Sequence, residues 1–145
     1  LLKRIRTAVL AVRQSPTPDT AAALIFVVAF ALTWRRQGKD LMDGKVRREG
    51  LVRLHLMQMA VLLMIFGAHR TTPDSELLRM LLSEDRSDMF DLGHLIEVPT
   101  GEGKSLVITV GAAVLGLLGI GCDVVCFSRS LTQRDARSAQ HFFVW

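Results

Sequence analysis

The stretch that most constrains the fold is a glycine loop lying between two apolar segments. The β-branched run "HLIEV" (94–98) precedes the loop "PTGEGKS" (99–105), and "LVITVGAAVLGLLG" (106–119) follows with the length of a helix. A second β-branched run, "CDVVCFS" (122–128), comes next. This order of strand, loop, helix and strand predicts an α/β fold built on a βαβ unit, whose two strands lie parallel with a right-handed crossover.

The loop carries the residue types that bind phosphate. Gly101 and Gly103 allow backbone N–H groups to converge on an anion at the positive end of the following helix. The Lys104 ammonium can reach terminal phosphates as a mobile charge, and the Ser105 hydroxyl can bind Mg²⁺. Glu102, between the glycines, is expected to point to solvent. The strand–loop–helix context favours a phosphate site over the alternative, an ordinary strand-to-helix turn.

The loop departs from the strict phosphate-loop pattern, because Val98 stands where that pattern has its first glycine. In this respect "TGEGKS" (100–105) resembles the nucleotide loop of the SecA preprotein translocase motors, which belong to the DEAD-like helicase superfamily and commonly replace that glycine. Downstream, "LTQRDA" (131–136) is similar to the family's L-x-x-R-D-A element. Upstream, "RLHLMQMAVLLMI" (53–65) is similar to the family segment whose glutamine contacts adenine.

The resemblance implies a P-loop (RecA-like) lobe that binds ATP or ADP with Mg²⁺. Lys104 would be the catalytic lysine and Ser105 the residue that binds the metal through its hydroxyl. Gln58 would contact adenine, although 41 residues separate it from Thr100 and His55-Leu56 replaces the expected aromatic-acidic pair. The alternative is a glutamine that caps or bridges within a buried helix pair. The implied nucleotide-contacting residues are Gln58, Thr100, Gly101, Glu102, Gly103, Lys104 and Ser105.

The sequence before the loop predicts helices. Residues 1–14 form a short basic helix, an apolar helix follows the "SPTPDT" break and ends near residue 36, and 51–66 form a further buried helix. We divide the chain into a helical, basic N-terminal region (1–50) and a SecA/DEAD-like nucleotide-binding lobe (51–145). The lobe contains a polar insertion near 67–93, and both ends of the chain look cut, as in an incomplete domain.

The basic charge is concentrated near the N-terminus. Residues 1–53 hold eleven lysines and arginines against four acidic residues. Such a segment can meet anionic lipid or nucleic acid, or it can be a set of solvated helix ends. Nucleic acid is disfavoured because no aromatic residues are interleaved with the basic ones. The apolar run 21–32 has twelve residues, whereas a membrane span needs about 20.

The remaining candidates for chemistry are few. Cys122 and Cys126 lack the spacing of a zinc site and are expected to be reduced core residues. The four histidines do not fall at metal spacings. Arg134 and Asp135 are expected to form a helix-cap pair or an exposed ion pair. These features indicate an intracellular protein, in the cytoplasm or an organelle stroma, with peripheral membrane association left open, and not a secreted one.

The resemblance implies a motor that couples ATP hydrolysis to polypeptide translocation, with an unfolded polypeptide and a membrane channel or anionic membrane surface as partners. The acidic Mg²⁺ motif (Walker B) and second lobe of such motors do not occur before Trp145, so these residues are expected to bind nucleotide but hydrolyse it poorly. Whether the parent protein is an ATPase stays open. The alternatives are a membrane- or protein-associated module with a relic nucleotide site, and a nucleic-acid helicase lobe. Glu102 and the "RDA" element favour the translocase branch.

Overall fold

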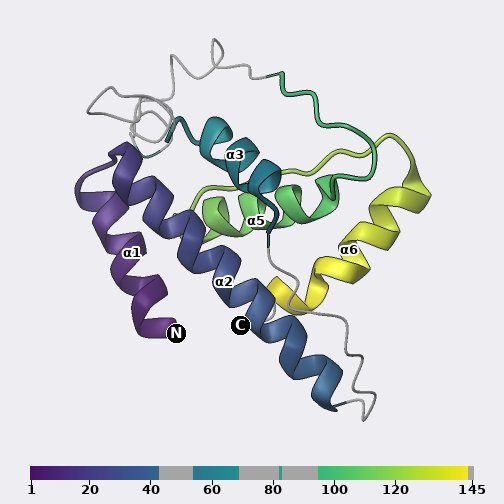
Figure 1. Ribbon diagram of the computed structural model, residues 1–145, viewed down its shortest axis with the longest axis horizontal. Helices are drawn as coiled ribbons and strands as arrows, with labels where there is room; N and C mark the ends of the chain where they lie inside the picture. Colours follow the sequence, from purple (N-terminus) through teal and green to yellow (C-terminus); the bar gives the residue numbers. More distant parts are fainter. Residues whose placement is uncertain (43–53, 69–81, 83–94, 144–145) are drawn as a thin grey trace.

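The computed structural model describes residues 1–42, 54–68, 82 and 95–143 (Figure 1). The helices assigned in these residues are α1 (Leu2–Gln14), α2 (Pro18–Met42), α3 (Leu56–Ile65), α5 (Lys104–Leu117) and α6 (Arg129–Phe143). The helix predicted to end near residue 36 therefore continues to Met42, and the one predicted over 51–66 is shorter. Most of the predicted polar insertion (67–93) lies outside the described residues.

A tight turn joins α1 to α2. The Thr17 N–H donates to Thr20 Oγ1 at 3.0 Å, and the Thr20 N–H donates to Thr17 Oγ1 at 3.3 Å. Pro18 stands at the first helical position, where its missing N–H costs no helical hydrogen bond. The two helices consequently run side by side in opposite directions, and α2 lies between α1 and the pair formed by α3 and α5 (Figure 1).

One apolar core joins these four helices. Its centre is α2, whose small and aliphatic side chains meet those of α1 on one side and of α3 and α5 on the other. The core takes side chains from both sides of position 50, where the sequence suggested a division. Its buried members are Ala8, Val12, Ala21, Leu24, Ile25, Val28, Ala29, Leu32, Val61, Leu62, Phe66, Val107, Val110, Val114 and Leu118.

The predicted α/β fold, with a P-loop (RecA-like) βαβ unit and parallel strands, is wrong for the part of the chain that the structure describes. Residues 95–99 and 120–127 form no strand there, and the structure in this part is helical. The side chains of Leu95, Val125 and Phe127 are almost fully exposed. A parallel strand is stabilised by a hydrogen-bonded neighbour and by layers covering both faces, and β-branched composition alone supplies neither.

Among the described residues, no helix is both long enough and apolar enough to cross a membrane.

A charged contact ties α1 to the end of α5. The Arg13 guanidinium donates from Nη2 to the Leu118 carbonyl oxygen at 2.8 Å. The last carbonyl groups of a helix lack intrahelical partners and carry a partial negative charge, so a cation there is stabilising. Arg13 thus satisfies the carboxyl end of the helix whose amino end carries the glycine loop.

We expect Arg13→Ala to lower the free energy of unfolding by about 1 kcal/mol, because it removes a charge-assisted hydrogen bond at a helix terminus. Arg6→Ala is the matched control, since Arg6 is exposed on the same helix. Urea unfolding followed by circular dichroism measures both variants. Equal losses in the two would show that the contact with Leu118 contributes nothing of its own.

Candidate functional site

The glycine loop enters α5 through two residues with left-handed backbone conformations. Gly101 has a φ of 94°, and Gly103, which caps α5, has a φ of 72° and a ψ of 41°. Side chains with a Cβ rarely adopt this region of φ, so the glycines are required by the path of the chain. The predicted glycine-shaped turn is therefore present, even though the predicted strand before it is not.

The amino end of α5 is open to an anion. Gly103 provides no side-chain cap, and the first helical hydrogen bonds, from Leu106 and Val107, run to its carbonyl oxygen. Within the described residues, the N–H groups of Gly103, Lys104 and Ser105 donate to no backbone or side-chain acceptor. Gly101, Gly103 and Lys104 are exposed. Unpaired N–H groups at the positive end of a helix are the arrangement that binds phosphate.

Lys104 folds back over this loop. Its Nζ atom donates to the carbonyl oxygens of Val98 at 2.7 Å and of Pro99 at 2.9 Å. A lysine at the amino end of a helix faces an unfavourable dipole, and these two carbonyl groups offset it. The ammonium group consequently lies at the start of the loop, on a flexible side chain that can exchange carbonyl oxygens for phosphate oxygens.

Gln58 reaches the loop from α3. Its side chain is only 5% exposed, and both ends of its amide are paired: Oε1 accepts the His55 N–H at 3.0 Å, and Nε2 donates to the Glu102 carbonyl oxygen at 2.8 Å. A Cβ added at Gly103 would collide with Gln58 Nε2. The fold therefore brings Gln58 and the loop together across the 41 intervening residues, and Gln58 acts there as a cap and a bridge. The side chain of Glu102 is half-buried rather than fully exposed.

Ser105 is paired with an acidic residue of α6. The Ser105 hydroxyl donates to Asp135 Oδ2 at 3.0 Å, while Asp135 Oδ1 accepts from Arg134 Nε at 2.9 Å. The expected exposed ion pair between Arg134 and Asp135 is present, with Nη2 also 2.9 Å from Oδ1. The contact between Asp135 and Ser105 was not predicted. The sequence marked the "RDA" element but contained no signal for its contact with the loop.

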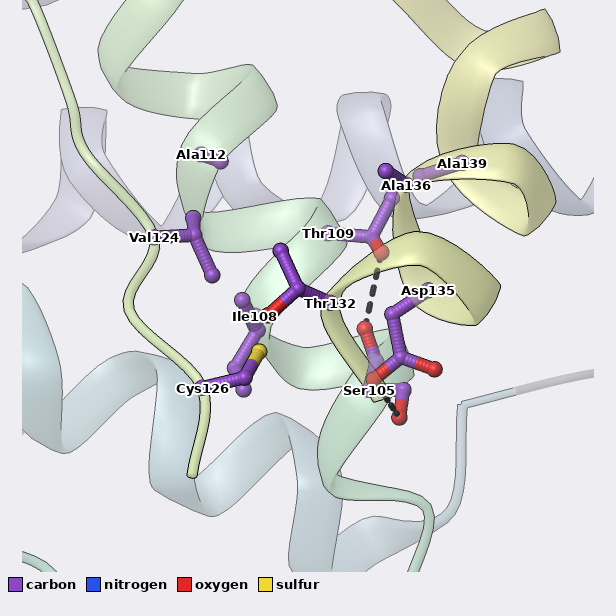
Figure 2. Close-up of a pocket in the computed structure, with 10 residues that line it drawn as sticks. All are labelled: Ser105, Ile108, Thr109, Ala112, Val124, Cys126, Thr132, Asp135, Ala136 and Ala139. Atoms are coloured by element: carbon purple, nitrogen blue, oxygen red, sulfur yellow. Dashed lines mark hydrogen bonds between the residues drawn. The ribbon is translucent and has the colours of Figure 1, made fainter. Parts of the chain in front are cut away.

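A cavity of about 260 Å³ adjoins this pair, between α5, α6 and the extended segment that includes Val124 and Cys126. Figure 2 shows Ser105 and Asp135 facing each other, with apolar side chains lining much of the rest. Cys126 is half-buried there and Cys122 is exposed. In the part of the chain that the structure describes, no three acidic, histidine or cysteine side chains gather as a metal cluster.

Comparison with known proteins shows what the segment that carries this site is similar to. Residues 88–145 match the family model of the SecA DEAD-like domain. A stretch of 45 residues is 44% identical to protein translocase subunit SecA 2 of Magnetococcus marinus, covering 31% of this chain and 7% of that protein. A stretch of 44 residues is 48% identical to protein translocase subunit SecA of Methylococcus capsulatus, covering 30% of this chain and 5% of that protein. No solved structure matches the chain.

The resemblance to SecA is thereby confirmed for this part of the chain, which is similar to the SecA DEAD-like domain and to short segments of protein translocase subunits. The matching segments span less than a tenth of the length of the curated relatives. The family match covers the loop, α5 and α6, whereas Gln58 and α3 lie outside it.

We expect Gly103→Ala to destabilise the protein by more than 1 kcal/mol, since a left-handed residue with a Cβ costs about 1–2 kcal/mol and Gln58 must also move. Gly101→Ala is the first control, because it adds the same strain with open space around the Cβ. Gly116→Ala is the second, because in the interior of α5 it should stabilise by up to about 1 kcal/mol. Thermal unfolding compares the three, and equal losses for positions 101 and 103 would mean that the Gln58 contact is unimportant.

Proposed function

We propose that the loop at residues 100–105 binds the phosphates of ATP or ADP together with Mg²⁺. The observation that carries this proposal is that the N–H groups of Gly103, Lys104 and Ser105 have no acceptor among the described residues and are reached through two left-handed glycines. The exposed Lys104 ammonium at the start of the loop adds a positive charge. Any helix start leaves N–H groups without intrahelical partners, but the two left-handed glycines and the lysine are additional features that fit an anion site.

Each loop residue has a distinct part in this proposal. Gly101 and Gly103 let phosphate oxygens approach the backbone, and Lys104 exchanges its bonds to Val98 and Pro99 for bonds to phosphate. Ser105 would hold Mg²⁺ through its hydroxyl oxygen; the ion, when bound, neutralises charge on the phosphates. Exposed Thr100 and the backbone of Glu102 complete the loop around the ligand.

Gln58 contributes to the same proposal as the residue that holds the loop. Its bond to the Glu102 carbonyl fixes the middle of the loop, and both the oxygen and the nitrogen of its buried amide have a partner. A contact with adenine, as the family resemblance implies, would have to reach this buried amide beside those two hydrogen bonds or in place of one of them. The structure supports the bridging role, and the adenine contact stays a prediction.

For the parent protein, we infer a motor that couples ATP hydrolysis to the movement of an unfolded polypeptide, as the match to protein translocase subunits supports. A membrane channel or an anionic membrane surface would be its second partner, with the protein located in the cytoplasm or an organelle stroma. Phosphoryl transfer also needs residues that position water and stabilise charge. The loop offers groups for binding but not this full set, and we expect these 145 residues to bind nucleotide and to hydrolyse ATP poorly.

We expect Lys104→Ala to weaken ADP binding at least tenfold, because each charge-assisted hydrogen bond to phosphate contributes about 1.5–3 kcal/mol. Lys3→Ala removes the same charge from an exposed position on α1 and serves as the matched control. Fluorescence anisotropy of a labelled ADP, measured with Mg²⁺ present, gives the affinities. The phosphate assignment would be wrong if wild type and Lys104→Ala bound with equal affinity.

A further inference from the structure

We propose that Asp135 is a positioning residue for Mg²⁺ at the phosphate loop and acts through the hydroxyl group of Ser105; this inference rests on the proposed nucleotide site. The two side chains come from different helices, α5 and α6, and are 30 positions apart in the sequence. Their hydrogen bond, 3.0 Å from Ser105 Oγ to Asp135 Oδ2, is drawn in Figure 2. It is the contact through which α6 reaches the loop.

The direction of the Ser105 hydroxyl hydrogen explains why this contact favours the binding of a cation. A serine hydroxyl has one hydrogen and two lone pairs. In the structure the hydrogen is directed to Asp135, so the lone pairs stay available on the oxygen atom. A cation binds such a lone pair, and an anionic acceptor for the hydrogen increases the electron density that the oxygen offers. Carboxylates that orient metal ligands in this way strengthen metal binding.

Asp135 is itself held in the orientation that this role requires. Arg134 donates from Nε to Oδ1 at 2.9 Å, and its Nη2 atom lies 2.9 Å from the same oxygen, which leaves Oδ2 for Ser105. The Asp135 side chain is 28% exposed, compared with 65% for Arg134. The helix that carries them begins at a serine cap, where the Leu131 N–H donates to Ser128 Oγ at 3.4 Å. Asp135 is therefore a partly buried carboxylate in which Oδ1 contacts Arg134 and Oδ2 contacts Ser105.

Two other roles for the contact make different predictions. If Asp135 merely joined α5 to α6, its loss would lower stability and affect ADP binding equally with and without Mg²⁺. If it held Ser105 away from the metal, its loss would strengthen Mg²⁺ binding. A positioning role requires a selective loss of Mg²⁺ affinity.

The test is to titrate Mg²⁺ into each variant saturated with labelled ADP, which gives the apparent Mg²⁺ affinity. The affinity for ADP without the metal is measured separately in EDTA. Asp135→Asn keeps the shape of the side chain, but its amide oxygen is expected to turn to Arg134 and its NH₂ group to Ser105. That NH₂ group would then donate to the lone pair that the metal needs. We expect the apparent Mg²⁺ affinity to fall about 10-fold or more in Asp135→Asn and Asp135→Ala, the range found for orienting carboxylates, with ADP binding in EDTA unchanged.

Two controls separate positioning from other effects. Asp123→Asn removes the same charge from an exposed position on the segment before α6 and should leave the titration unchanged. Ser105→Ala combined with Asp135→Ala should lower Mg²⁺ affinity no further than Ser105→Ala alone, because both changes remove one interaction. Circular dichroism tests whether each variant keeps its helices. If Asp135→Ala unfolds, the result for Asp135→Asn decides the test.

The outcomes are distinct. Unchanged or tighter Mg²⁺ binding in Asp135→Asn, or additive losses in the double variant, would overturn the role of Asp135 and leave the nucleotide site standing. If wild type bound no ADP with or without Mg²⁺, the proposed function would fail and this inference with it.

Discussion

The position of the candidate site depends on the burial of one face of α5. Val107, Val110 and Val114 recur at helical spacing and are buried against α2 and α3. Each buried aliphatic side chain contributes about 1.5–3 kcal/mol, so this stripe outweighs any single polar contact of the loop. Gly111 lies on the same side, where a Cβ would come 3.9 Å from Leu62. Because α5 is fixed to the core, the loop at its first residue is fixed as well.

The polar contacts act on this rigid helix at its two ends. Arg13 meets the carbonyl of Leu118 at the carboxyl end, and the amino end is left to the loop, where Lys104 is held by carbonyl oxygens rather than by a carboxylate. The result is a helix whose negative end has a cationic partner and whose positive end keeps N–H groups without an acceptor among the described residues. This asymmetry is what an anion-binding helix requires, and it follows from which residues the core places beside each end.

Local patterns in the sequence predicted the local features of the structure. The glycines of "TGEGKS" predicted the loop, and the length of 106–119 together with its glycines predicted a helix, which the structure places at Lys104–Leu117. The strands predicted at 94–98 and 122–128 are not formed by the described residues of these segments, because strand formation depends on a partner elsewhere in the chain, which β-branched residues do not specify. Local patterns likewise specify no contacts between distant residues, so they predicted neither the distance between Gln58 and the loop nor the contact between Asp135 and Ser105. The family resemblance implied that Gln58 lies near the loop, whereas the contact between Asp135 and Ser105 became apparent only in the fold.

The apolar core includes helices that lie outside the segment that resembles SecA, and these helices help to hold the loop in place. The match begins at residue 88, yet the side chains that bury α5 come from α2 and α3, and the residue that holds the middle of the loop is Gln58. Residues 88–145 without these helices would expose the valine stripe and leave the Glu102 carbonyl unpaired. Segments outside the match are therefore part of the structure that presents the loop. The segment resembling the motor family and the helices before it share one apolar core, and the loop lies where α3, α5 and α6 meet.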